Sequence, residues 1–527
     1  MSAEPGVHRA GAGQDEPAES TSVVIVGAGP VGLMLAGELR RAGVEVVVLE
    51  RLAEPVRWPR SLFVQNRSME VLAQRGLDWF ADAPRWHNYN FGFLHLSRLR
   101  DDADFVPRYA PQHRFEELLE ERAGRMGAAI RRGHEIVGLT QDGDGVLARV
   151  RTDTAEYDLR AAYLVGCDGG RSTVRRLAGI AFPGTAATVS GITAWVSVKE
   201  DQFPSGVHAD IHPTGIVAVA RLEPGLFRAT TIEFGTELPD REAEVTTEEM
   251  AAAARRIAGV DLAVEQTHWI SRFGNATRLT TDYRLGQMLL AGDAAHIHFA
   301  SAAQGLNTGI QDAVNLGWKL AGEIAGWAPP GLLDSYHRER HPIGRRVCMY
   351  SQAQVALYHP LEEVAPLREL LAELFGMEEV SRFLLELSTG TGIRYPFEAA
   401  AHPLLGRRVP DARLARSDGA GTIFETLHDG RGVVLDLTED RSGAGGADGA
   451  GGWADRVAVV RAEPVPDLAA KVLLVRPDGY VAFADADGSD HDGLRRALTT
   501  WFGAPNLPVS GAGVPAPGAV RAGSSGG

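Results

Sequence analysis

Six residues near the start of the chain, Gly27-Ala28-Gly29-Pro30-Val31-Gly32, have the spacing that holds the pyrophosphate of a dinucleotide. Gly27 permits a tight turn, Gly29 lets backbone N–H groups approach the phosphates, and Gly32 lets a helix pack closely on a strand. The positive end of that helix then attracts the anion. The spacing predicts a dinucleotide site, although a glycine-rich loop without a ligand can have the same letters.

The elements around this loop strengthen the prediction. The apolar run Val23 to Val26 precedes it, a helical pattern follows it, and a second apolar run, Val44 to Leu49, ends in Glu50. This order of strand, turn, helix, strand and acidic residue is the full context of a Rossmann-like unit. Glu50 is at the right distance to accept hydrogen bonds from a ribose 2′-hydroxyl, and its charge would reject a 2′-phosphate.

The bulk properties exclude several classes of protein. The 527 residues predict two to four domains, and the net charge of −15 argues against nucleic acid as a partner. The two cysteines, Cys167 and Cys348, exclude a disulfide framework and favour a cytoplasmic location. No apolar run approaches the roughly 18 residues that span a bilayer, so we expect no membrane partner. Residues 1–21 and 509–527 have the composition of disordered ends.

The middle of the chain has a different pattern. Between residues 185 and 275, segments such as ITAWVSV, GIVAVARL and LFRATTIEF are rich in β-branched residues and are separated by turns. They predict an antiparallel sheet that is inserted into the dinucleotide-binding domain and forms the far wall of a substrate pocket. The candidate pocket residues on it are Trp195, His208, Asp210, His212 and Glu233. The alternative is that the polar ones lie on a solvated face of the sheet.

Further motifs resemble those of class A FAD-dependent hydroxylases, which share the para-hydroxybenzoate hydroxylase fold and tailor polyketides in actinobacteria. These motifs are GDAAHIHFASAAQGLNTGIQDA (292–313), Asp168-Gly169-Gly170 and LLDSYHRERHPIGRR (332–346). The resemblance implies FAD as cofactor and a polyketide as the small-molecule partner. The resemblance and the Gly27–Gly32 motif together imply a set of cofactor-binding residues. They are Gly27, Gly29, Pro30, Val31, Gly32, Glu50, Arg51, Gln112, Asp168, Gly292, Asp293, Gly305, Leu306 and Asn307.

The resemblance also implies an α/β architecture with three parts. The FAD-binding domain covers 22–184 and continues, with a helical linker, over 276–400, on either side of the inserted sheet. Residues 401–508 resemble a thioredoxin-like C-terminal domain. That domain has no Cys-x-x-Cys, because no cysteine follows Cys348, so we expect no thiol redox chemistry there. A homo-oligomer is possible. His296 and His298 have metal-ligand spacing but no further partner set, and we expect no metal.

The sequence departs from the family pattern at three places, two of them at the expected flavin. Phe299, Ala300, Ala302 and Ala303 occupy positions where the family has Pro-Pro and Gly-Gly. Phe63 replaces a usual small Gly, and Gln287 replaces a usual Arg. A methyl group in place of Gly restricts the backbone and would crowd the site of oxygen activation. Phe63, Phe299 and Ala302 therefore join the candidate substrate pocket, and no catalytic residue is assigned.

These departures favour a cyclase that holds FAD without net redox turnover and folds a linear polyene for a decalin-forming [4+2] cycloaddition. Such a pocket acts by proximity and orientation and needs no acid–base pair. The alternative is an NAD(P)H- and O₂-dependent monooxygenase that hydroxylates or epoxidises an aromatic polyketide, and only then would NADPH or NADH be a cofactor. A catalytically silent FAD-binding regulator is a third hypothesis.

Overall fold

The computed structural model describes residues 19–58, 60–86, 89–96, 106–199, 202–203, 207–240, 243–299, 303–397, 402–417, 419–439 and 448–506. The predicted disordered ends fall almost wholly outside these ranges, as do Ala300 and Ala302. In the described part, no helix combines the length and apolarity that crossing a bilayer requires.

The first layer is a mostly parallel sheet with the strand order β18-β19-β10-β1-β2-β7, which the β8–β9 hairpin extends alongside β10. Its strands are β1 (Glu19–Val26), β2 (Val46–Glu50), β7 (Ala129–Arg132), β8 (Glu135–Asp142), β9 (Gly145–Arg151), β10 (Glu156–Gly166), β18 (Arg284–Leu285) and β19 (Met288–Leu290). β1 lies between β2 and β10 and pairs with both in parallel. Its Val23, Val24 and Ile25 are fully buried, as the continuous apolar run predicted.

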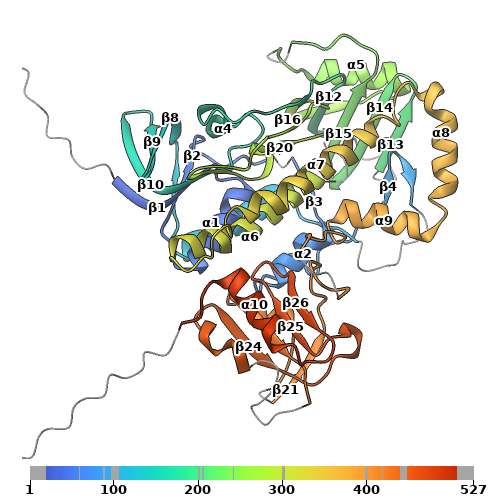
Figure 1. The fold of residues 1–527 in the computed structure, drawn as a ribbon. Coiled ribbons are helices and arrows are strands. Elements are labelled where there is room, and N and C mark those ends of the chain that lie inside the picture. Colours follow the sequence, from blue (N-terminus) through green and yellow to red (C-terminus); the bar gives the residue numbers. More distant parts are fainter. Residues whose placement is uncertain are drawn as a thin grey trace, which may run out of the picture.

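Helices cover this sheet and connect it to the rest of the chain (Figure 1). The helices outside the inserted segment and the C-terminal domain are α1 (Pro30–Arg41), α2 (Asn66–Ala73), α3 (Gln112–Arg125), α4 (Thr173–Leu177), α6 (Gln304–Ile324), α7 (Ser335–Val355), α8 (Leu361–Leu374) and α9 (Glu378–Thr389). α6 is buried along most of its length, and its buried residues include the polar side chains of Asp312, Asn315 and Lys319.

The inserted segment forms a five-stranded antiparallel sheet with the order β13-β14-β15-β12-β16. Its strands are β12 (Ser190–Val198), β13 (Val207–His212), β14 (Gly215–Glu223), β15 (Leu226–Glu233) and β16 (Val264–Gly274). One helix, α5 (Thr247–Ala258), packs on one face through Met250, Ala254 and Ile257. The opposite face of this sheet is directed toward the domain that contains the parallel sheet. Phe273 and Ile232 of the inserted sheet cluster there with Phe299.

The C-terminal domain contains β23 (Gly432–Asp436), β24 (Val457–Arg461), β25 (Val472–Val475) and β26 (Val481–Asp485), in the order β24-β23-β25-β26. β23 and β24 are parallel, β25 and β26 are antiparallel, and α10 (His491–Phe502) follows. This arrangement agrees with the predicted thioredoxin-like topology. The three parts together confirm the predicted α/β fold class.

Glu38 on α1 is a buried carboxylate that holds three arginines. Its side chain forms ion pairs with Arg41 at 2.7 Å, Arg75 at 2.8 Å and Arg122 at 3.5 Å. Arg122 lies on α3, and Arg75 also donates to the carbonyl of Pro477 in the C-terminal domain at 3.2 Å. Burial opposes its ionisation, but these arginines hold the pKa of Glu38 at about 2. One carboxylate therefore connects three separate parts of the chain.

We predict that Glu38→Gln lowers the free energy of unfolding by about 3 kcal/mol, because three buried guanidinium groups lose their counter-charge. A pKa that is lower in the folded state than the ordinary 4.5 stabilises the protein above that pH. The stabilisation is lost as pH falls from about 4.5 toward 2. Urea unfolding at pH 7 and pH 4 measures both effects. The exposed Glu45→Gln is the matched control, and equal loss in both variants would contradict the assignment.

Candidate cofactor and substrate site

The Gly27–Gly32 loop joins β1 to α1 at the carboxyl edge of the parallel sheet. Gly27 has φ +107°, and a Cβ there would lie 2.5 Å from the carbonyl oxygen of Cys167. A Cβ on Gly32 would lie 2.0 Å from the carbonyl oxygen of Gly27, whereas a Cβ on Gly29 would meet nothing within 4 Å. The first and third glycines are thus required by packing, and the middle one leaves open space above the backbone. That is the arrangement that the pyrophosphate prediction requires.

Glu50 ends β2 beside this loop. Its Oε2 accepts a hydrogen bond from the Ala28 amide at 2.9 Å, and its Oε1 accepts one from the Leu52 amide at 2.9 Å. The carboxylate is therefore positioned next to the phosphate-binding turn, where a ribose of a bound dinucleotide would lie. The next residue, Arg51, is exposed at the same edge.

Asp168 follows β10, the strand on the other side of β1. Its Oδ2 accepts from the amides of Thr173 at 2.6 Å and Val174 at 3.1 Å, and so caps α4. Its Oδ1 is buried and has no partner in the described part of the chain, and burial raises the pKa of this carboxyl. A buried acceptor without a donor is costly, so a donor from a bound ligand fits this position.

The second motif meets the first through Val31. A Cβ on Gly292 would lie 2.9 Å from Val31 Cγ2, and one on Gly309 would lie 2.5 Å from the same atom. Val31 is therefore a packing residue that brings the start of α1 against α6. Leu306 is partly buried against the same core. The two motifs, which are 260 residues apart in the chain, form one site.

At the start of α6, Gly305 faces two polar side chains. A Cβ there would lie 3.5 Å from Asp293 Oδ1 and 3.6 Å from His298 Nε2. Asp293 is exposed at this point. His298 Nδ1 lies 2.8 Å from the carbonyl oxygen of Phe299 and must donate to it, so Nε2 is an acceptor; burial lowers the pKa of this imidazole. Nε2 is buried without a partner among the described residues, so His298 joins the candidate site. In the sequence, the one signal for His298 is its place within the second cofactor motif.

Asn307 and Gln112, both predicted cofactor contacts, instead hold the chain between Ser61 and Gln65. Asn307 donates to the carbonyls of Phe63 at 3.2 Å and Ala303 at 2.8 Å, and accepts from the Gln65 amide at 2.8 Å. Gln112 Oε1 accepts from the Ser61 amide at 3.1 Å. Both side chains position Phe63. A direct contact between either side chain and FAD remains a prediction.

The ring of Phe63 belongs to an aromatic group. Its centroid lies 5.1 Å from that of Trp86 and 6.1 Å from that of Tyr109, with which β3 (Phe63–Val64) pairs through β6 (Arg108–Tyr109). The Phe63 side chain therefore packs against two aromatic rings, and a glycine at this position would make neither contact.

The inserted sheet separates the predicted pocket residues into two groups. Trp195 alternates with Ala194 and Val196, which pack against α5, so Trp195 lies on the opposite face. There its ring contacts Trp58 at 5.6 Å between centroids. Phe299 adjoins the same face through Phe273, at 6.0 Å. The prediction that these two residues share a wall agrees with this placement.

The four polar candidates lie on the α5 face, so placing them in that wall was wrong. Glu233 forms an ion pair with Arg256 of α5 at 2.8 Å. The three β13 residues His208, Asp210 and His212 are in register with β14 residues on the α5 side of the sheet, which are Val219, Val217 and Gly215. The period of two had predicted the alternation correctly, but the face that α5 covers was not anticipated.

Ala303 marks the start of α6 with φ +53° and ψ 28°. This left-handed conformation favours glycine, the residue that the family pattern has here, and costs an alanine on the order of 1 kcal/mol. The chain keeps the left-handed turn although it lacks the glycine that would adopt this conformation without steric cost. Ala300 and Ala302 cannot be compared in this way, because they lie outside the described residues.

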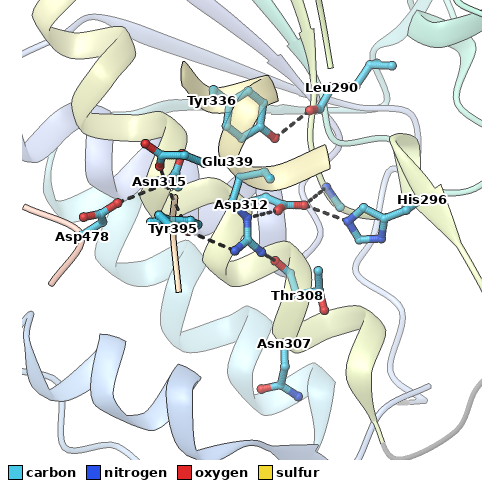
Figure 2. Close-up of polar contacts among 12 residues, drawn as sticks. Leu290, His296, Asn307, Thr308, Asp312, Asn315, Tyr336, Glu339, Tyr395 and Asp478 are labelled. Carbon is cyan, nitrogen blue, oxygen red and sulfur yellow. Dashed lines mark hydrogen bonds and ion pairs between the residues drawn. The ribbon is translucent and has the colours of Figure 1, made fainter. Parts of the chain in front are cut away.

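Behind the site lies a buried polar network (Figure 2). Asp312 accepts from Arg340 Nε at 2.7 Å and from the Gly292 amide at 3.2 Å, and it lies 2.8 Å from His296 Nε2. His296 is thus committed to Asp312. Within the described residues, no three His, Cys, Asp or Glu side chains gather so as to hold a metal ion.

Comparison with known proteins matches two stretches of the chain to known families. Residues 20–351 match the family model described as FAD binding domain, and residues 402–505 match the one described as aromatic-ring hydroxylase, C-terminal.

Similar proteins extend over nearly the whole chain. The 12-dehydrotetracycline 5-monooxygenase/anhydrotetracycline 6-monooxygenase of Streptomyces rimosus is 45% identical over 503 residues, which cover 92% of this chain and 99% of that protein. The structure of an anhydrotetracycline hydroxylase from Streptomyces rimosus has a TM-score of 0.85 and 44% identity, covering 92% of this chain and 100% of the other. A dialkyldecalin synthase of Streptomyces rugosporus is 41% identical, covering 92% and 99%.

We predict that Glu50→Arg yields protein with at most about a tenth of the wild-type bound flavin, because the substitution removes the acceptor for a ribose hydroxyl and reverses the charge beside the loop. The absorbance of purified protein at the flavin band, divided by that of the protein, measures occupancy. The matched control is Glu54→Arg on the following exposed segment, which should retain flavin. Full occupancy in Glu50→Arg would remove this residue from the site.

A second substitution tests the strained turn. Ala303→Gly should raise the free energy of unfolding by about 1 kcal/mol, because glycine adopts positive φ without the steric cost. Thermal unfolding of the flavin-loaded protein measures this change. An exposed helical control, Ala365→Gly on α8, should be destabilised by a similar amount. Destabilisation of both variants would show that the turn at residue 303 is not strained.

Proposed function

The chain belongs to the FAD-binding family of aromatic-ring hydroxylases, FAD-dependent enzymes that tailor polyketides, and we propose that it is an NAD(P)H- and O₂-dependent monooxygenase of an aromatic polyketide. The observation that carries the proposal is the full-length similarity to the tetracycline-pathway monooxygenase. The similarity extends over both cofactor motifs, the inserted sheet and the C-terminal domain. This similarity favours a monooxygenase over the decalin-forming cyclase.

The described residues fit FAD on observations independent of that similarity. The open backbone at Gly29, the Glu50 carboxylate beside it and the unpaired Asp168 Oδ1 lie around the carboxyl ends of β1, β2 and β10. When bound, FAD would supply the hydride-accepting and oxygen-activating chemistry. The protein would contribute binding, orientation and exclusion of water, the last through Phe299, Phe273 and Ile232.

Stopped-flow absorbance of the flavin-loaded protein tests this function. We expect NADPH or NADH to bleach the flavin without air, and admission of oxygen to restore it. Anhydrotetracycline is the first candidate substrate to include, because a similar protein is named for it. Free FAD at equal concentration is the control for uncatalysed reduction. Absence of reduction with both nucleotides, with and without substrate, would contradict a monooxygenase.

A second candidate, the decalin-forming cyclase, has one structural observation in its favour. Ala303 holds the turn before α6 with a methyl group at the position where the family has Gly, and the same family includes the dialkyldecalin synthase. On this alternative the flavin would stay oxidised in the stopped-flow experiment. Product analysis with a linear polyene would then show cyclisation without consumption of nucleotide or oxygen.

A further inference from the structure

Arg228 is a half-buried arginine that no carboxylate neutralises within the described part of the chain. Its Nε donates to Thr193 Oγ1 at 3.3 Å, and its two terminal nitrogens meet no hydrogen-bond partner among the described residues. Burial lowers the pKa of this guanidinium. The arginines of the Glu38 and Asp312 clusters, by contrast, each face a carboxylate. A guanidinium that is partly removed from water and has no counter-charge is typical of a site that receives an anion.

The strand register places Arg228 on the face that adjoins Phe299. Arg228 on β15 is directly opposite Trp195 on β12, and the next residues on this face are Thr230 and Thr193, which also oppose each other. Ile232 follows, and it clusters with Phe299. Four residues along a strand correspond to about 13 Å. The face therefore has an apolar end at Phe299 and a cationic, aromatic end at Arg228 and Trp195.

The threonine pair leaves a second donor at the cationic end. Thr193 Oγ1 accepts from Arg228 Nε and also from Thr230 Oγ1, at 3.1 Å. A hydroxyl that accepts twice retains its own hydrogen for donation. Arg228 and Thr193 thus offer donors to the same acceptor. Trp58, which packs on Trp195 and on His268, encloses this end of the face.

We propose that Arg228 binds an ionised oxygen of the substrate, such as a carboxylate, enolate or phenolate, with Thr193 as the second donor. The inference rests on the proposed function only in that this face holds the substrate. Planar guanidinium groups bind such oxygens with directional, charge-assisted hydrogen bonds. Arg228 therefore selects acidic substrates and fixes which end of the molecule lies away from Phe299.

The test compares two probes of one shape, anthraquinone-2-carboxylate and its neutral amide, titrated into flavin-loaded protein while the flavin spectrum is followed. We expect the wild-type protein to bind the carboxylate more tightly than the amide. Arg228→Gln should reduce that preference by roughly 10- to 100-fold, the effect of one charge-assisted interaction, with little change for the amide. Arg228→Lys should keep part of the preference because it keeps the charge.

The matched control is Arg256→Gln, the same change in α5, whose Arg256 pairs with Glu233 on the opposite face of the sheet. It should leave the preference unchanged, and flavin occupancy verifies that each variant is folded. The proposal is overturned if the wild-type protein does not prefer the carboxylate, or if both Arg→Gln variants lose the preference equally. The outcome is independent of flavin reduction by NADPH, so failure of this inference and failure of the monooxygenase proposal are distinguishable.

Discussion

The ionised side chain of Asp312, buried completely in the middle of α6, is the constraint on which the rest of the structure depends. Transfer of a carboxylate from water into the protein interior costs several kcal/mol unless its partners are fully assembled. Here the partners are Arg340 from α7, His296 and the Gly292 amide from the second cofactor motif. Both the turn that faces the cofactor and the helix behind it must be in place before this cost is offset. The geometry of the motif therefore depends on the buried contacts of Asp312 with Arg340, His296 and the Gly292 amide.

The same network extends into the C-terminal domain. Arg340 donates to the Tyr395 hydroxyl at 3.2 Å, and Asn315 bridges Tyr395, Glu339 and Asp478. Glu339 binds Arg476 of the C-terminal domain at 2.7 Å and Lys319 at 2.9 Å. Those two cations hold the pKa of Glu339 at about 2, while burial lowers that of Lys319 to about 8. A buried network that is only partly satisfied is worse than an apolar core. The C-terminal domain thus completes the ion pairs of α7, although it lacks the thiols of a redox domain.

The sequence predicted those features that depend on neighbours in the chain. The Gly27–Gly32 turn, the position of Glu50 and the alternation of the inserted strands follow from local spacing, and the structure has all three. The wrong placements have long-range causes. His208 and Glu233 alternate correctly, but their face was determined by α5, a helix that forms between β15 and β16. The contacts of Asn307 are also long-range, because its side chain donates to the carbonyl of Phe63, 244 residues away in the chain, and its contact with FAD stays a prediction. Arg228 was missed because an unpaired charge is visible only when all of its neighbours are known.

The departures near residue 300 show why a local change and a global resemblance can favour different reactions. The family includes both an oxygen-using and a ring-forming enzyme with nearly the same length and coverage, so the cofactor cradle and the inserted sheet are common to both chemistries. The residues that distinguish them must therefore touch the substrate or the reactive face of the flavin. The alanine at residue 303 is the local change that favours the cyclase, whereas the full-length similarity favours the monooxygenase. On the proposal that the sheet face between Phe299 and Arg228 holds the substrate, the shape and charge of that face would determine which molecule meets the flavin and in which orientation.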